Sequence, residues 1–235
     1  KVLLVPGAHG KVDPRAVTET IERRSDIHYP KPQVLTVTQA TELGTLYSCA
    51  ELREVGELAR RHGLKLHMDG ARFANALAGL GCAPAELTWK AGVDVLTFGG
   101  TKNGMPVGEA VIFFDQGLAD EFDYRCKQAG QLASKMRFLA APWVGLLESD
   151  TLTSHAAHAN RCARLLASRL VGIGGIQLAE EVQANAVFVQ MDPALIDALH
   201  AEGWHFYTFI GSGFARFMCS WQTREKDIEL LCAEI

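Results

Sequence analysis

The sequence lacks the features that mark several common classes of protein. Its 23 lysines and arginines and 27 aspartates and glutamates give a net charge of −4, and charges of both signs are interspersed along the chain. This composition offers no basic patch for nucleic acid or for an anionic membrane surface. No run approaches the roughly 18 apolar residues that cross a membrane, and the apolar run at 1–6 is too short for a signal peptide. We therefore expect a cytoplasmic protein with no nucleic acid and no membrane as partner.

The sequence lacks paired cysteines, and the spacing of those present argues against disulfides and metal sites. The six cysteines lie singly, with no CxxC pair, in a chain long enough to fold without a disulfide framework. We expect them to be reduced. His155 and His158 have the i, i+3 spacing of one helix face, but no third metal ligand lies near them in the sequence. This pattern is typical of two histidines on a helix surface, so we expect no metal.

The glycines do not form the phosphate-binding loop of a nucleotide triphosphatase. In that motif a glycine directly precedes the lysine, whereas Thr101 precedes Lys102 here, and the earlier glycine position is also unfilled. In the stretch 5–11, Val5 occupies the position of the first glycine. The sequence therefore does not favour a nucleotide triphosphatase.

What the sequence does contain is an alternation of short apolar runs and helical patterns. Hydrophobic residues make up 48% of the chain, which is enough for a sizeable core. Runs of strand length, several of them separated by helical patterns, predict a parallel α/β sheet. These runs are Val2–Val5, Val34–Val37, Leu64–Asp69, Val93–Phe98 and Ala110–Phe114.

The clearest helix begins after Ser48. Ser48 and Glu51 form a capping box, an apolar stripe continues to Ala59, and Gly63 stands where a helix commonly ends. Further helices are predicted over about 84–91, 118–147 and 153–170.

The carboxy-terminal part has a different pattern, which is typical of a smaller α+β domain. Strand-like runs and helices alternate after the glycine-rich stretch 172–175. We therefore predict a large domain over residues 1–147 and a small domain over residues 148–235. The predicted elements of the small domain are strands at Ala186–Met191, Trp204–Phe209 and Phe214–Trp221, a helix at Pro193–His200 and a helix after Thr223.

Charged residues follow two neighbouring predicted strands. Asp69 ends one strand and is followed by Arg72, and Lys102 lies in the glycine-rich loop after the next strand. Ligands of open α/β sheets bind beyond the carboxyl ends of the strands, so both loops would deliver their charges to one edge. Taken singly, each residue is more typical of a helix cap, a surface charge or a solvated loop. Together they meet the needs of pyridoxal 5'-phosphate (PLP), which requires a lysine for an imine and a carboxylate against its pyridine nitrogen.

The two loops resemble the paired signature of the threonine aldolases, in the β-eliminating lyase family of fold-type-I PLP enzymes. The resemblance extends over essentially the whole chain. The residues that carry it are His67-Met68-Asp69-Gly70-Ala71-Arg72, Gly99-Gly100-Thr101-Lys102-Asn103-Gly104, Lys127-Gln128-Ala129-Gly130 and Phe214-Ala215-Arg216-Phe217. It implies an α/β, PLP-dependent transferase-like (fold type I) large domain, incomplete at the N-terminus, plus a smaller α+β C-terminal domain.

The resemblance also implies which residues hold the cofactor. Asp69 would pair with the pyridinium nitrogen, Arg72 would lie against the phenolate oxygen, and Lys102 would form the imine. Lys127 would reach a phosphate, in a neighbouring subunit's site. Lys102 must be partly neutral to exchange imines, and a dry site beside Arg72 would lower its pKa in that direction.

Two further residues would act on the substrate. Arg216 would bind its carboxylate, because a planar guanidinium binds a carboxylate at two points. Glu42 stands in a loop where many family members have a histidine, and it is our candidate base for the β-hydroxyl proton. An ordinary loop carboxylate is an equally good interpretation of Glu42.

Three hypotheses for function follow. The first is retro-aldol cleavage of L-threonine or L-allo-threonine to glycine and acetaldehyde, in a homotetramer built from catalytic dimers. The second is a PLP lyase that prefers bulkier β-hydroxy amino acids such as phenylserine. The third is an inactive module, because the family's amino-terminal phosphate-binding loop and its ring-stacking histidine have no counterpart in this sequence. For that reason we expect a fragment with weak PLP binding and little activity.

Overall fold

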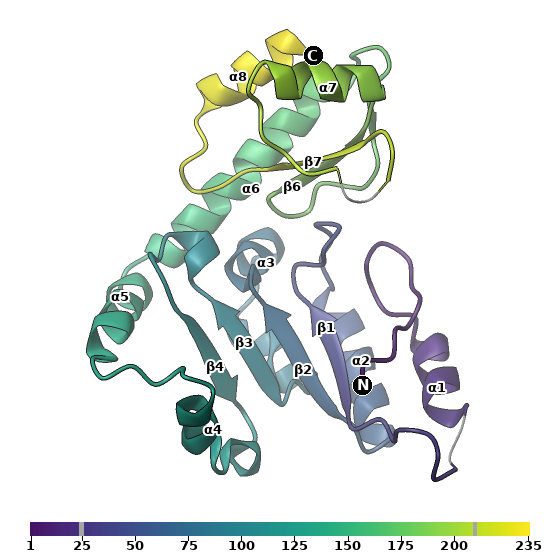
Figure 1. Cartoon of the computed structure of the whole chain (residues 1–235), viewed down its shortest axis with the longest axis vertical. Coiled ribbons are helices and arrows are strands. Elements are labelled where there is room, and N and C mark those ends of the chain that lie inside the picture. The colour runs from purple at the N-terminus through teal and green to yellow at the C-terminus, as the bar shows by residue number, and fades with distance from the viewer. Residues whose placement is uncertain (24–25, 209–210) are drawn as a thin grey trace.

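Two separate sheets organise the chain (Figure 1). The computed structural model describes residues 1–23, 26–208 and 211–235. The large sheet has the order β1-β2-β3-β4 and the small sheet the order β5-β6-β7. Their strands are β1 (Val34–Thr38), β2 (Lys65–Gly70), β3 (Val95–Gly99), β4 (Glu109–Phe113), β5 (Gln177–Leu178), β6 (Ala186–Gln190) and β7 (Phe214–Met218). In the described part of the chain, no helix has the length and apolar character that crossing a membrane requires.

The first three strands of the large sheet are parallel neighbours, as their apolar runs predict. Alternation along β2 buries Leu66 and Met68 completely and turns His67 and Asp69 to the other face of the sheet. Asp69 pairs with Thr38, the last residue of β1, and with Thr97 on β3, two residues before that strand ends. The carboxyl ends of β1, β2 and β3 therefore meet at one edge, and Asp69 is the last residue of β2 with a side chain.

The prediction of a parallel sheet does not hold at β4. This strand runs antiparallel to β3, with Glu109 opposite Gly99 and Phe113 opposite Val95. The connection between the two strands, residues 100–108, is shorter than the crossover of about a dozen residues that a parallel pair needs. The predicted strand at 2–5 is also wrong, because these residues form no strand and are largely exposed at Val2 and Leu4.

The predicted helix after Ser48 is present as α2 (Cys49–Arg61). The Ser48 hydroxyl accepts from Glu51 N–H at 3.2 Å, and the Glu51 carboxylate accepts from Ser48 N–H at 2.7 Å. Gly63 follows the helix with a φ of 66°, a conformation that favours glycine. The other α-helices are α1 (Pro14–Glu22), α3 (Phe73–Leu80), α4 (Phe122–Gln128), α5 (Arg137–Glu148), α6 (Thr151–Leu170), α7 (Pro193–Ala201) and α8 (Glu225–Glu234). Of these, α1 and α3 have no counterpart among the predicted helices.

Two predicted helices are replaced by shorter elements. Residues 84–91 form the 3-10 helices η1 (Pro84–Leu87) and η2 (Trp89–Ala91), because Thr88 between them leaves the helical conformation with φ −124° and ψ −113°. The stretch 118–147 is divided among η4 (Gln116–Ala119), α4 and α5. Gly130, with a φ of 70°, follows α4 and interrupts the helical pattern.

The predicted strand Trp204–Phe209 is also wrong in its described residues. They form no strand, and Tyr207 makes an isolated β-bridge to Arg216 on β7. Phe209 lies outside the described residues.

Two hydrophobic clusters correspond to the two sheets, and α6 contributes to both. The cluster of the large sheet includes Leu152 and Ala156 from the first half of α6. The cluster of the small sheet includes Cys162 and Leu166 from its second half. Figure 1 shows α6 running from the edge of the large sheet to the small sheet. The boundary after Leu147 lies just before this helix and stays a prediction.

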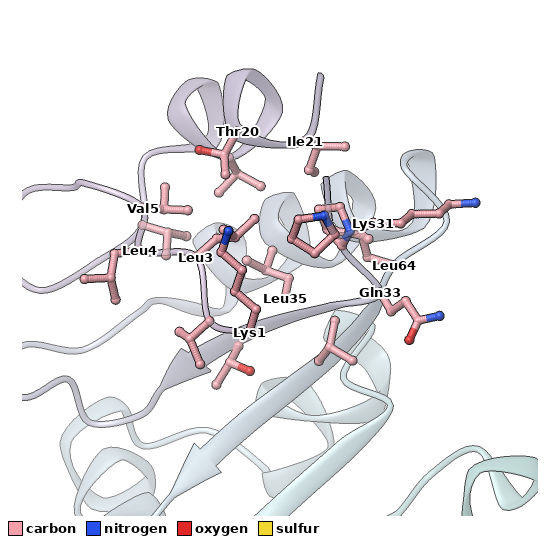
Figure 2. Close-up of a pocket in the computed structure, with 17 residues that line it drawn as sticks. Lys1, Leu3, Leu4, Val5, Thr20, Ile21, Lys31, Gln33, Leu35 and Leu64 are labelled. Carbon is pink, nitrogen blue, oxygen red and sulfur yellow. The ribbon is translucent and has the colours of Figure 1, made fainter. Parts of the chain in front are cut away.

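A cavity of about 630 Å³ lies at the β1 edge of the large sheet (Figure 2). Its walls come from β1, α1 and the first residues of the chain and are mainly aliphatic, as at Leu3, Val5 and Leu35. It opens beside the amino-terminal half of β1, and none of the six predicted site residues lines it. Asp69 and Lys102 lie instead at the carboxyl ends of β2 and β3.

Candidate active site

The loop of Lys102 lies directly against the turn 69–72. A Cβ atom at Gly99 would approach the Cα and carbonyl oxygen of Ala71 to 2.7 Å, a distance that no side chain tolerates. Glycine at this position therefore lets the end of β3 touch the turn after β2. The loop then enters the 3-10 helix η3 (Thr101–Asn103), which presents Lys102 beside that turn.

Hydrogen bonds fix both the side chain and the backbone of Asp69. Its Oδ1 accepts from the N–H of Ala71 at 2.9 Å, and its carbonyl oxygen accepts from the N–H of Gln39 at 2.9 Å. A carboxylate has about four acceptor positions. The half-buried side chain can therefore accept a further donor, such as a pyridinium N–H, without losing its orientation.

Arg72 carries a donor that fits an oxygen ligand. Its Nε is buried and has no hydrogen-bond partner in the part of the chain that the structure describes. Burial and the neighbouring charge of Arg216 lower the pKa of Arg72, and Glu42 and Asp69 oppose that shift. A buried N–H without an acceptor costs about 1–3 kcal/mol. A ligand that brings an anionic oxygen removes this penalty, so the donor fits the phenolate oxygen of PLP.

Lys102 has an amine made more reactive by its surroundings. The residue is exposed, yet nearby protein atoms remove part of the hydration of its amine. This desolvation and the charge of Arg72 lower the pKa of Lys102, whereas Asp69, Glu42 and Glu109 oppose the shift. A lower pKa leaves more of the amine neutral and nucleophilic near neutral pH.

Arg216 reaches the same region from the small sheet. Its side chain is 10% exposed, and Nη1 lies 3.8 Å from Oε2 of Glu42, whose side chain is 64% exposed. The guanidinium lies 5.9 Å from the ring centre of Phe188, and its Nε lies 3.1 Å from Sδ of Met218. Arg216 is thus packed on its own sheet while its charge faces the large sheet.

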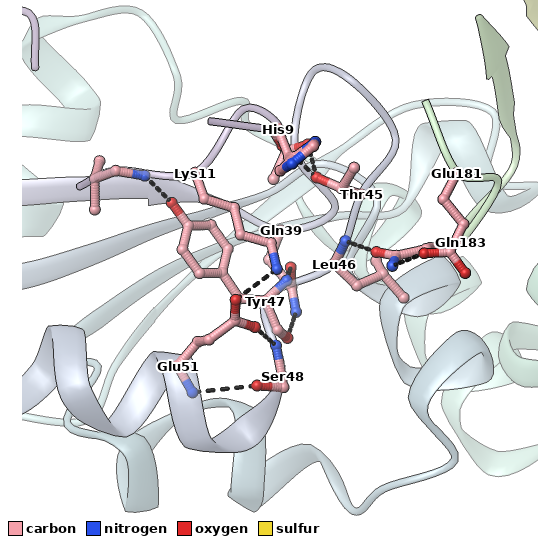
Figure 3. A network of polar contacts seen from close by, with 12 residues as sticks. His9, Lys11, Gln39, Thr45, Leu46, Tyr47, Ser48, Glu51, Glu181 and Gln183 are labelled. Atoms are coloured by element: carbon pink, nitrogen blue, oxygen red, sulfur yellow. Dashed lines mark hydrogen bonds and ion pairs between the residues drawn. The ribbon is translucent and has the colours of Figure 1, made fainter. Parts of the chain in front are cut away.

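The loop that carries Glu42 is held by Gln39, which is fully buried (Figure 3). Nε2 of Gln39 donates to the carbonyl oxygen of Tyr47 at 2.8 Å, and Oε1 accepts from the N–H of Tyr47 at 3.0 Å. Across the loop, the hydroxyls of Thr41 and Thr45 lie 2.7 Å apart. These bonds join the two sides of the loop, so Glu42 projects from a loop of fixed conformation.

Lys127 does not join this group of residues. It is exposed on α4, whose Phe122 ring contacts Phe113 at 4.9 Å between ring centres. Phe113 lies opposite Val95, at the end of β3 away from Lys102, and Figure 1 shows α4 at that end of the sheet. Within one chain, the structure brings together Glu42, Asp69, Arg72, Lys102 and Arg216, and it leaves Lys127 apart.

The expectation that the two histidines of α6 lie on the helix surface is wrong. Both are half-buried: His155 Nδ1 donates to the carbonyl oxygen of Asn103 at 3.0 Å, and His158 Nε2 donates to that of Thr223 at 2.7 Å. No group of three or more metal-ligating side chains occurs among the described residues. All six cysteines are free, as expected.

His67 is a neighbour of the site that the sequence-based prediction missed. Its Nε2 lies 3.3 Å from the hydroxyl of Thr97, on the face of β2 that also carries Asp69. Burial lowers the pKa of His67, and the charge of Asp69 opposes the shift. The two-residue spacing from Asp69 is a signal that could have identified it.

Comparisons with known proteins agree with this geometry. The model of the β-eliminating lyase family matches residues 1–194. The low specificity L-threonine aldolases of Pseudomonas sp. (strain NCIMB 10558) and Pseudomonas aeruginosa are 60% and 59% identical over 235 residues, which is all of this chain and 68% of each relative. The structure of Leishmania major threonine aldolase has a TM-score of 0.90 at 27% identity, over 99% of this chain and 69% of that one.

These findings confirm the expected fold type I and PLP as the cofactor. The large sheet is mixed, whereas a parallel sheet was predicted. The chain belongs to the β-eliminating lyase family.

Proposed function

We propose that this chain cleaves L-threonine or L-allo-threonine to glycine and acetaldehyde, as a PLP-dependent carbon–carbon lyase. The observation that carries the proposal is the convergence of Asp69, Arg72 and Lys102 from the large sheet with Arg216 from the small sheet. The names of the relatives at 59–60% identity support the same activity. None of the relatives described above favours a lyase for bulkier amino acids.

The residues of the large sheet would hold the cofactor. Bound PLP supplies a protonated pyridine ring that accepts the electron pair left on Cα when the Cα–Cβ bond breaks. Asp69 would keep the proton on the ring nitrogen, since its carboxylate has acceptor positions to spare. Arg72 would donate its buried Nε–H to the phenolate oxygen. Lys102 would supply the amine that attaches the cofactor.

Glu42 and Arg216 would act on the substrate in turn. Glu42 now pairs with the guanidinium of Arg216, and a substrate carboxylate would compete with it for the same donors. Bidentate binding favours the substrate over a single contact at 3.8 Å. The displaced Glu42 would then be available to take the β-hydroxyl proton, directly or through water.

We also propose that Lys127 acts in the site of a neighbouring subunit, within a homotetramer of catalytic dimers. Its exposed position at the far end of the large sheet supports a role across a subunit boundary and not in its own site. Mixing a Lys127→Ala chain with a Lys102→Ala chain tests this. Recovered activity in the mixture supports shared sites, and its absence in a mixture shown to form hybrids contradicts them.

The activity is tested on the purified protein as the cell makes it. PLP should produce an absorbance change that Lys102→Ala abolishes and Lys90→Ala, a control on η2, retains. L-threonine should then yield glycine and acetaldehyde in equal amounts. A protein that binds PLP through Lys102 but releases no glycine would overturn the proposed reaction.

A further inference from the structure

The loop of Lys102 is attached to α6 by two hydrogen bonds. Buried Asn103 donates its side-chain Nδ2 to the carbonyl oxygen of Leu152 at 2.6 Å, and its own carbonyl oxygen accepts from Nδ1 of His155 at 3.0 Å. Gly104 follows, and a Cβ atom there would come within 2.8 Å of the same nitrogen. The backbone next to Lys102 therefore rests directly on the imidazole of His155.

The bond to Asn103 fixes the protonation pattern of His155. A carbonyl oxygen only accepts, so His155 must carry a proton on Nδ1 in both its neutral and its charged form. The other neutral tautomer would place two lone pairs against each other. The contact is therefore a specific hydrogen bond and not merely packing.

On its ring face, His155 contacts the segment that follows the strand of Arg216. The rings of His155 and Trp221 are stacked, with centres 5.0 Å apart and planes 14° from parallel. Trp221 comes shortly after β7, and Cys219 between them exchanges two hydrogen bonds with Asn185, at 2.9 and 2.7 Å. One imidazole thus contacts the loop of Lys102 and the segment beyond Arg216.

His158, one helical turn further on, is hydrogen-bonded to the second of these segments. Its Nε2 donates to the carbonyl oxygen of Thr223 at 2.7 Å and lies 3.4 Å from Sγ of Cys162. In the described part of the chain, its hydrogen bonds do not involve the loop 99–104. His158 is therefore a matched control for His155, on the same helix and against the same segment.

We propose that His155 is a positioning residue that holds the loop of Lys102 in a fixed place relative to Arg216. It acts through Asn103 on one side and Trp221 on the other, so that the amine and the guanidinium meet one amino acid ligand. This inference rests on the proposed function, in which both groups act on the same ligand. His155 itself would touch neither the substrate nor the cofactor.

The test separates the two contacts of His155 with two substitutions. His155→Asn keeps an N–H donor near the place of Nδ1 but loses the stacked ring, whereas His155→Phe keeps a stacked ring but loses the donor. His158→Gln is the control. In the PLP-free chain, competitive acetylation with isotopically labelled acetic anhydride at about pH 8, followed by mass spectrometry, measures the reactivity of Lys102 against exposed Lys31.

His155→Phe should lower the relative acetylation of Lys102 by about threefold or more, the change that half a pKa unit produces. A loop released from His155 hydrates the amine and moves it away from Arg72, and both changes raise its pKa. His155→Asn should remain close to the unmodified chain. His158→Gln should lower the melting temperature without changing the acetylation of Lys102.

Equal acetylation of Lys102 in the unmodified chain and in His155→Phe would overturn the proposal, and so would an equal loss in His155→Asn. If His155→Phe does not fold, His155→Met replaces it and also removes the Nδ1–H donor; the same fall in acetylation is expected, and an unchanged value would contradict the proposal. Failure of PLP to bind through Lys102 would overturn the proposed function alone. The acetylation result would still decide the role of His155.

Discussion

Glu42 and Arg216 face each other across the two sheets, and their ion pair is weak by its geometry. The charged atoms lie 3.8 Å apart and the carboxylate is 64% exposed, which for such pairs corresponds to about 0–1 kcal/mol. A substrate carboxylate can therefore displace Glu42 at little cost. Until the substrate arrives, the carboxylate of Glu42 occupies a position next to the guanidinium of Arg216.

We predict that Glu42→Gln lowers KM for L-threonine and lowers kcat together. The neutral amide competes less for Arg216, and removal of a general base typically reduces the rate by about 10²-fold or more. Steady-state kinetics on the PLP-loaded protein measures both constants. Glu57→Gln, an exposed position on α2, should change neither. A lower KM with unchanged kcat would show that Glu42 only pairs with Arg216 and is not the base.

His67 gives the site a defined response to acid. Burial lowers its pKa below the ordinary value of 6.5, despite the nearby charge of Asp69. The unfolded chain therefore binds this proton more readily than the folded one, so the effect is absent well above pH 6.5 and destabilises the fold as the pH falls below it. We predict that His67→Gln loses less melting temperature than the unmodified chain between about pH 7.5 and about pH 5.5. Exposed His205→Gln is the control, and equal losses in all three proteins would contradict the prediction.

Among the elements, the loop between β1 and α2 depends on Gln39. Its amide satisfies both the N–H and the carbonyl oxygen of buried Tyr47. We predict that Gln39→Leu destabilises the chain by roughly 2–4 kcal/mol, because two buried backbone groups lose their partners. Urea unfolding measures the change, with Gln128→Leu on the exposed face of α4 as control. A loss as small as that of the control would mean that the loop is held without Gln39.

Elements with local signals were predictable from the sequence. The four strands of the large sheet follow from apolar runs, and α2 follows from its capping box. By contrast, α3 has apolar residues on most of its surface, as at Phe73, Ala76 and Leu77, so no amphipathic stripe marks it. The antiparallel direction of β4 is not encoded in its alternation, although the short connection before it was a usable signal.

The same distinction applies to the site. Asp69 and Lys102 were predictable because polar residues at strand ends are visible in a single sequence, and Arg216 followed only from the resemblance to a family. His155 could not be predicted, because its role depends on Asn103, far away in the sequence, and on the stacking of Trp221. Contacts of this kind exist only after the helix and both sheets have assembled.

At the scale of the whole molecule, α6 connects the two sheets through a buried pair of asparagines. Asn75 on α3 donates its Nδ2 to Oδ1 of Asn160 at 3.1 Å, and Asn160 donates its Nδ2 to the carbonyl oxygen of Asn75 at 2.9 Å. Both side chains are almost completely buried. Because the site takes Arg216 from one sheet and Lys102 from the other, the join between α3 and α6 also sets the distance across the site.

We predict that Asn160→Leu increases amide hydrogen exchange in both α3 and α6 by about tenfold, which corresponds to about 1.4 kcal/mol of local stability. The substitution removes the 3.1 Å acceptor of the buried Asn75 amide and the donor to its carbonyl oxygen, and the amide keeps a longer bond of 3.5 Å to the carbonyl oxygen of Ala156. Asn185→Leu is the matched control, because this buried asparagine bonds within the small sheet region, to Cys219. It should increase exchange near β6 and β7 and leave α3 unchanged. If Asn160→Leu affected α6 alone, the two helices would be joined by apolar packing and the asparagine pair would not be what fixes Lys102 relative to Arg216.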